Sequence, residues 1–104
     1  MKTKWFREAI VGRRRVAAYI LDFFGINSKK KFLQRVSDME QYIKTNPYSP
    51  KVDPLFSNDD KVYRSFFING LSRMVYYMED DVVNIVSFFD GRCDAEEEAK
   101  RVTE

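Results

Sequence analysis

The chain has 104 residues, the usual size of one domain, so we expect residues 1–104 to form a single domain. Its hydrophobic content of 44% is enough for a core and excludes a disordered chain. With no histidine and one cysteine, Cys93, the sequence excludes an internal disulfide framework, a Cys/His zinc site and histidine-based catalysis. We therefore expect no metal and no cofactor. A lone cysteine fits the cytoplasm, and no apolar run approaches the roughly 20 residues of a membrane span.

The net charge of +2 conceals an asymmetry between the two halves of the chain. Residues 1–52 hold 12 Lys/Arg and 4 Asp/Glu, a net charge of +8, whereas residues 53–104 hold 6 and 12, a net charge of −6. One interpretation is a basic face suited to an anionic partner. The other is that the two halves attract each other across the fold.

The first half predicts a short strand followed by two helices. Residues 2–6 favour an edge strand, with a helix as the alternative. An apolar stripe at three- to four-residue spacing over residues 9–24 predicts a helix that Gly25 ends. Asn27 or Ser28 is suited to cap a second helix, which Asn46-Pro47 ends. The short loop between them indicates an antiparallel helical hairpin.

The second half predicts three strands and a C-terminal helix. Residues 45–58 hold all three prolines and are typical of a surface connection. Three strand-like runs follow within residues 62–92, separated by turns at Asn69-Gly70 and at residues 79–81. Asp94 is suited to cap a short final helix. The expected fold class is α+β: an antiparallel sheet with the helical hairpin on one face, in the order β-α-α-β-β-β, plus a short C-terminal helix.

A two-residue turn at Asn69-Gly70 would pair Ile68 with Leu71 and thereby place Arg64 and Arg73 on one sheet face. An apolar sheet face that carries arginines predicts a partner surface, with Arg92 at its rim. The alternatives are that the C-terminal helix covers this face or that a homodimer buries it. The predicted partner-binding residues are Arg64, Phe66, Arg73, Val75, Tyr77, Asn84, Phe88 and Arg92. The opposite face, expected against the helices, carries Tyr63, Phe67, Met74, Tyr76, Val83, Ile85 and Phe89.

These residues resemble a known family. The segment Ser72–Glu97, with its EDDVV turn and closing basic residue, is similar to the C-terminal part of toxins of the RelE/ParE superfamily, from bacterial type II toxin–antitoxin modules. Trp5 with Ala9, residues 18–20, and Asn46-Pro47 resemble its first strand and its helices. The resemblance implies a growth-arresting protein that a cognate protein antitoxin neutralises. It also implies contact with DNA only indirectly, through the antitoxin.

The family has two mechanisms: RelE-like members cleave mRNA on the ribosome, whereas ParE-like members inhibit DNA gyrase and are not enzymes. The resemblance makes Arg64, Arg73 and Arg92 the candidate catalytic or phosphate-binding residues. The RelE-like pattern has a second basic residue where Phe66 stands and a C-terminal tyrosine, but residues 93–104 contain no aromatic side chain. Arginine stays protonated and is a poor base. The sequence therefore favours the gyrase-directed branch, with an mRNA endonuclease or a degenerate non-toxic member as alternatives.

Overall fold

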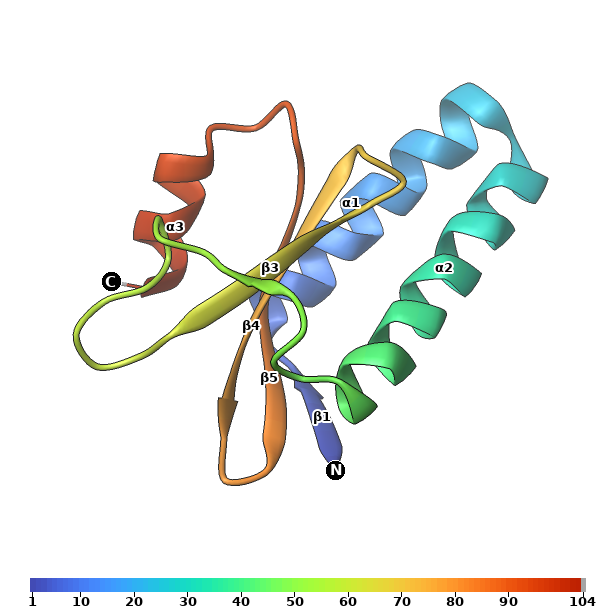
Figure 1. Cartoon of the computed structure of the whole chain (residues 1–104). Coiled ribbons are helices and arrows are strands. Elements are labelled where there is room, and N and C mark those ends of the chain that lie inside the picture. The colour runs from blue at the N-terminus through green and yellow to red at the C-terminus, as the bar shows by residue number, and fades with distance from the viewer. Residues whose placement is uncertain (104) are drawn as a thin grey trace.

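The computed structural model describes residues 1–103 and shows a sheet with a helical hairpin on one side and a short helix on the other (Figure 1). This confirms the predicted fold class and adds one two-residue strand. None of the helices in residues 1–103 has the length and apolar character needed to cross a membrane. The elements are β1 (Lys2–Trp5), α1 (Arg7–Phe24), α2 (Ile26–Thr45), β2 (Lys51–Val52), β3 (Tyr63–Ile68), β4 (Ser72–Glu79), β5 (Val82–Asp90) and α3 (Ala95–Thr103).

The strands lie in the order β1-β5-β4-β3-β2. All neighbours are antiparallel except β1, which pairs parallel to β5, so the sheet is mixed. This pairing confirms that residues 2–5 form an edge strand rather than a helix. It also joins the start of the described chain to its last strand, with the Phe6 amide continuing the ladder to the Ile85 carbonyl at 2.9 Å.

The helical hairpin turns on a single residue. Gly25 has φ +91°, a conformation that a glycine adopts without steric cost, and it separates α1 from α2. The predicted caps Asn27 and Ser28 are wrong, because α2 already begins at Ile26. α1 lies directly on β5, where a Cβ added at Gly12 would come within 1.7 Å of the Phe88 carbonyl oxygen. The absence of a side chain at Gly12 therefore sets the distance between helix and sheet.

The Asn69-Gly70 turn has the predicted chemistry but not the predicted register. Asn69 and Gly70 have φ of 54° and 70°, and the Leu71 amide donates to the Ile68 carbonyl at 3.1 Å, as in a type I′ turn. The ladder, however, resumes one residue later, with Ile68 opposite Ser72. Leu71 is an extra residue whose carbonyl accepts the Gly91 amide at 2.6 Å. Since strand side chains alternate, this single residue exchanges the two faces of β4 relative to our expectation.

Both faces of the sheet are consequently buried. The helix-side core contains Ala9, Val16, Ala17, Phe32, Val36, Ile43, Ile68, Met74, Tyr76, Val83, Ile85 and Phe88. The core on the other side contains Phe56, Tyr63, Val75, Tyr77, Val86, Phe89 and Ala99, contributed by the sheet, the β2–β3 connection and α3. Of the residues expected against the helices, Tyr63 and Phe89 lie in this second core instead. This small α+β domain thus has three layers (Figure 1).

Candidate functional site

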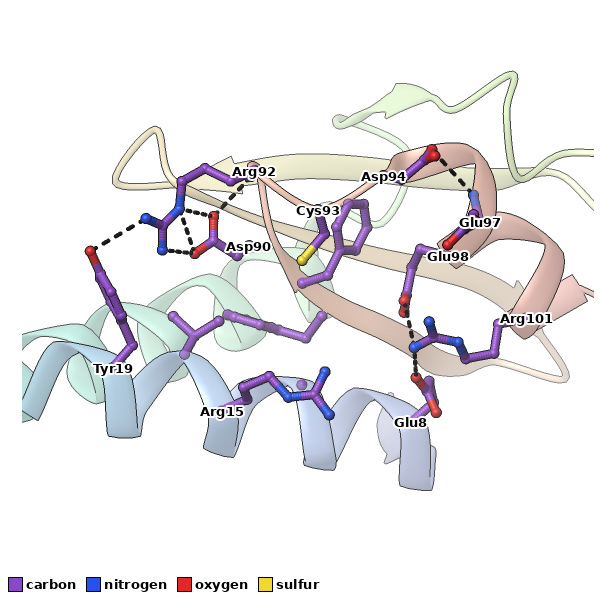
Figure 2. A pocket seen from close by; sticks show the side chains of 14 residues that line it. Glu8, Arg15, Tyr19, Asp90, Arg92, Cys93, Asp94, Glu97, Glu98 and Arg101 are labelled. Carbon is purple, nitrogen blue, oxygen red and sulfur yellow. Dashed lines mark hydrogen bonds and ion pairs between the residues drawn. The ribbon is translucent and has the colours of Figure 1, made fainter. Parts of the chain in front are cut away.

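Arg92 is the predicted site residue that the structure leaves accessible. It follows β5 and forms an ion pair with Asp90 at 2.8 Å, while its side chain remains 66% exposed. Its guanidinium carbon lies 4.6 Å from the centre of the Tyr19 ring, and its Nη1 is 3.5 Å from the Tyr19 hydroxyl (Figure 2). The hydrogen bonds from Arg92 hold the pKa of Asp90 below its usual value. At neutral pH this is an ionised, surface-facing pair resting on an aromatic ring of α1.

Arg73 lies on the sheet face away from the hairpin and is neutralised within the chain. Its Nη2 is 2.7 Å from an oxygen of Asp53, whose side chain is fully buried. The same carboxylate accepts the Ser65 hydroxyl at 2.7 Å and the Leu55 amide at 3.0 Å. These bonds attach the β2–β3 connection to β3 and β4. The buried Nε of Arg73 has no hydrogen-bond partner among the described residues.

Arg64 lies on the opposite face from Arg73, so the predicted common face for these two arginines is wrong. The extra residue Leu71 is the reason: Arg64 pairs with Tyr76, and Arg73 pairs with Phe67. Arg64 Nη1 donates to the carbonyls of Tyr48 and Pro50 at 3.0 and 2.7 Å. Its role in the structure is to anchor the proline-containing connection after α2.

The structure removes four further residues from the predicted partner surface because it buries them. Phe88 turns to the helix-side core, because a bulge near Val75 and Tyr76 shifts the β4–β5 register. The Asn84 amide nitrogen donates to the Val82 carbonyl at 3.0 Å. The exposed fractions are 0% for Val75, 1% for Phe88, 7% for Asn84 and 8% for Tyr77. Phe66 is partly buried against the helix-side core.

In the structure, the C-terminal helix α3 covers this face of the sheet, as one of the alternatives from the sequence had it. The Asp94 carboxylate accepts the Glu96 amide at 3.0 Å, which confirms the predicted cap of α3. The buried Glu98 accepts the Ser87 hydroxyl at 2.6 Å. Arg101 then links Glu98 at 3.2 Å to Glu8 of α1 at 3.0 Å (Figure 2). Sequence reasoning missed this cluster, because Glu8 and Arg101 are 93 positions apart in the chain and the burial of Glu98 depends on β5.

A cleft of about 600 Å³ lies between α1, α3 and the end of β5, and Arg92 is on its wall (Figure 2). Arg15, Arg92 and Arg101 supply its positive charge, and Glu8, Asp90 and Glu97 are among its carboxylates. The lining includes no histidine, the side chain most often used for proton transfer at neutral pH. Within residues 1–103, no three acidic or cysteine side chains are arranged to hold a metal ion. The cleft is lined by charges of both signs and is suited to binding charged groups.

The arrangement of helices and strands is shared with a solved structure described as "Chromosomal ParDE TA system from P. aeruginosa". The two chains are 13% identical, the TM-score is 0.69, and the match covers 86% of this chain and 95% of that chain. This chain has the fold of a ParDE toxin–antitoxin system chain. At this identity the likeness to the ParDE chain concerns the fold alone. No protein-family model matches the sequence, and no curated protein matches it.

Proposed function

We propose that this protein is the toxin of a type II toxin–antitoxin module, that a cognate antitoxin neutralises it, and that its target is DNA gyrase. The observation that carries the proposal is the fold shared with the ParDE chain over 86% of the residues. The resemblance of Ser72–Glu97 to the C-terminal part of RelE/ParE toxins supports the same assignment independently of the fold. In this proposal DNA is reached only through the antitoxin or the target.

The positions of the three candidate arginines favour a binding mechanism over RNA cleavage. Cleavage through a ribose hydroxyl needs a proton acceptor, a proton donor and cations around one phosphate. Arg64 and Arg73 lie on opposite faces of the sheet, and each is engaged by groups of its own chain. Residues 93–103 carry no aromatic side chain to act as a proton donor. These facts support a toxin that binds and inhibits its target.

The antitoxin surface that we propose lies where α1, α2 and the β3–β4 turn meet. A groove of about 480 Å³ runs there, with Phe24 and Leu71 on its walls and Arg92 at its edge. Phe24, Phe67 and Leu71 are 63%, 57% and 60% exposed, which is unusual for large apolar side chains that group at one end of a domain. Aromatic and arginine side chains dominate the binding energy of protein interfaces. This surface replaces the sheet face that the sequence predicted.

A growth experiment tests the proposal. Induced expression of the chain alone should arrest growth, and co-expression of an adjacent small gene should restore it. Purified protein should inhibit supercoiling by gyrase and leave gyrase-linked DNA breaks, with mRNA 5′ ends unchanged. Leu71→Glu should weaken antitoxin binding, whereas Leu55→Glu, at an exposed leucine outside the groove, should not. Unaffected growth would support the degenerate, non-toxic alternative.

The endonuclease alternative can be tested at one contact. The Tyr19 hydroxyl lies 3.5 Å from Arg92, and Tyr19 is the one tyrosine that contacts a candidate arginine in the lining of the cleft. New mRNA ends in ribosome-bound messages, lost in Tyr19→Phe and retained in Tyr42→Phe, would favour that alternative. Tyr42 is an exposed tyrosine of α2 and serves as the matched control.

A further inference from the structure

The positive charge of the helical hairpin is not compensated inside the described chain. α1 and α2 carry nine Lys/Arg and four Asp/Glu. Every ion pair in residues 1–103 takes its cation from Lys61, Arg73, Arg92 or Arg101, none of which belongs to the hairpin. One ion pair, between Glu8 and Arg101, does join the two halves of the chain, but it uses no cation of the hairpin. Direct ion pairs therefore leave the positive charge of the hairpin unbalanced.

Two of the four carboxylates of the hairpin are engaged by other parts of the chain. Glu8 pairs with Arg101, and Glu40 accepts the Trp5 indole N–H at 3.1 Å and the Thr3 hydroxyl at 2.5 Å. The first turn of α2 contains no acidic residue, and three lysines follow it at once. Cations near a helix N-terminus oppose the helix dipole, at a cost of about 0.3–1 kcal/mol each. No carboxylate of the described chain offsets this cost.

A groove between α1 and α2 collects part of this charge around an apolar floor. Its volume is about 630 Å³. Leu21 and Leu33 line it with 37% and 38% of their surfaces exposed. Arg13 and Arg14 of α1 and Lys29 of α2 also line the groove, whereas its carboxylate, Glu40, is engaged by Thr3 and Trp5. The groove is an apolar strip with unpaired cations on both sides. It therefore complements an amphipathic segment that carries carboxylates on either side of its apolar face.

We infer that the α1–α2 groove docks an acidic amphipathic segment of a partner protein. Apolar side chains of that segment contact Leu21 and Leu33, and its carboxylates reach Arg14 and Lys29. The observations favour protein over nucleic acid. None of the residues lining the groove is aromatic, so bases have no side chain to stack on there. Trp5 lies outside the lining, and its ring is covered by Arg13 at 4.4 Å from the ring centre. The inference is separate from the toxin assignment and concerns a different surface.

The experiment uses the full chain and a fluorescent synthetic helix with a leucine stripe flanked by glutamates. Fluorescence anisotropy should show binding that weakens as salt rises, because exposed charges are screened. The same peptide with lysines in place of the glutamates, a DNA duplex and vesicles of anionic lipid are the competing probes. We expect Arg14→Glu/Lys29→Glu to weaken binding of the acidic peptide at least about tenfold, which corresponds to about 1.4 kcal/mol.

The matched control is Arg7→Glu/Arg35→Glu, which changes net charge equally on the same two helices but outside the groove. It should bind the acidic peptide within about twofold of the wild type; circular dichroism establishes that both variants fold. Chemical-shift changes on peptide binding should centre on Ala17 and Leu33. Equal losses in the two double variants, or equal binding of the lysine peptide, would overturn the inference. So would tighter binding of DNA or vesicles that depends on Arg14 and Lys29.

Discussion

The buried ion pair between Asp53 and Arg73 should stabilise the sheet face away from the hairpin, and its removal is the most direct test of that face. Asp53 is fully buried and Arg73 is 20% exposed at the side chain. Asp53→Asn removes the charge that faces the guanidinium and keeps one acceptor oxygen, which can serve the Leu55 amide or the Ser65 hydroxyl but not both, because these donors bind different oxygens of Asp53. Breaking one partner of a buried pair costs about 3–5 kcal/mol, and the partial exposure of Arg73 places the expected cost near the lower value, about 3 kcal/mol.

A double-mutant cycle separates the pair from its surroundings. Arg73→Met removes the cation while keeping much of the packing volume, and the double variant should be destabilised by less than the sum of the single changes. We expect a coupling free energy of about 2–3 kcal/mol, measured by urea unfolding with Trp5 fluorescence and circular dichroism. The exposed pair of Asp90 and Arg92 is the control and should show no measurable coupling. Additive effects at Asp53 and Arg73 would refute the reasoning.

Three further changes probe other contacts. Gly12→Ala should destabilise the chain by about 3 kcal/mol or more in the same unfolding assay, because the new Cβ lies 1.7 Å from the Phe88 oxygen and needs at least 3.0 Å; a stable, folded variant would contradict the close packing of helix and sheet. Phe56→Ala should cost about 3–5 kcal/mol, since this ring is 1% exposed; a loss under about 1 kcal/mol would show that the second core is loose. Burial raises the pKa of Tyr76 to about 12, and its hydroxyl donates to the Pro47 carbonyl at 2.5 Å. Because the pKa of Tyr76 is higher in the folded than in the unfolded chain, the protonated hydroxyl contributes fully to the free energy of unfolding below about pH 10. This contribution is lost as the pH rises toward 12. Tyr76→Phe should flatten that alkaline decline in stability, and an unchanged pH profile would argue against the assignment.

The helices and strands were predictable from local signals, but the grouping of the arginines was not. Apolar periodicity located both long helices, and Asn69-Gly70 adopts the turn expected of it. The register depended on where pairing resumes after that turn, which is coupled to the Gly91 amide on the Leu71 carbonyl. That bond comes from the end of β5, far along the chain, and no local pattern encodes it. One residue of slip then moved Arg64 and Arg73 to opposite faces.

The partners of the candidate residues were equally invisible from local sequence. Asp53 stands in a proline-containing segment that indicated only a surface connection, yet it is buried against Arg73. The sequence predicted the short final helix and its Asp94 cap, but not that Glu98 of this helix would be buried on Ser87. Arg92 was placed at a rim by sequence, and it is the candidate that remains exposed. Burial of charged groups depends on contacts between distant segments, which composition and spacing do not specify.

The parallel pairing of β1 with β5 bears on how the protein folds as it leaves the ribosome. Lys2–Trp5 is made first, but its partner Val82–Ile85 follows some eighty positions later. α1 also rests on β5, so the apolar side of the hairpin lacks this part of its packing surface until that strand has been synthesised. Folding with such distant contacts is slow, and early intermediates expose apolar surface. The finished fold, and any activity that depends on it, therefore arises only after nearly all of the described chain has been translated.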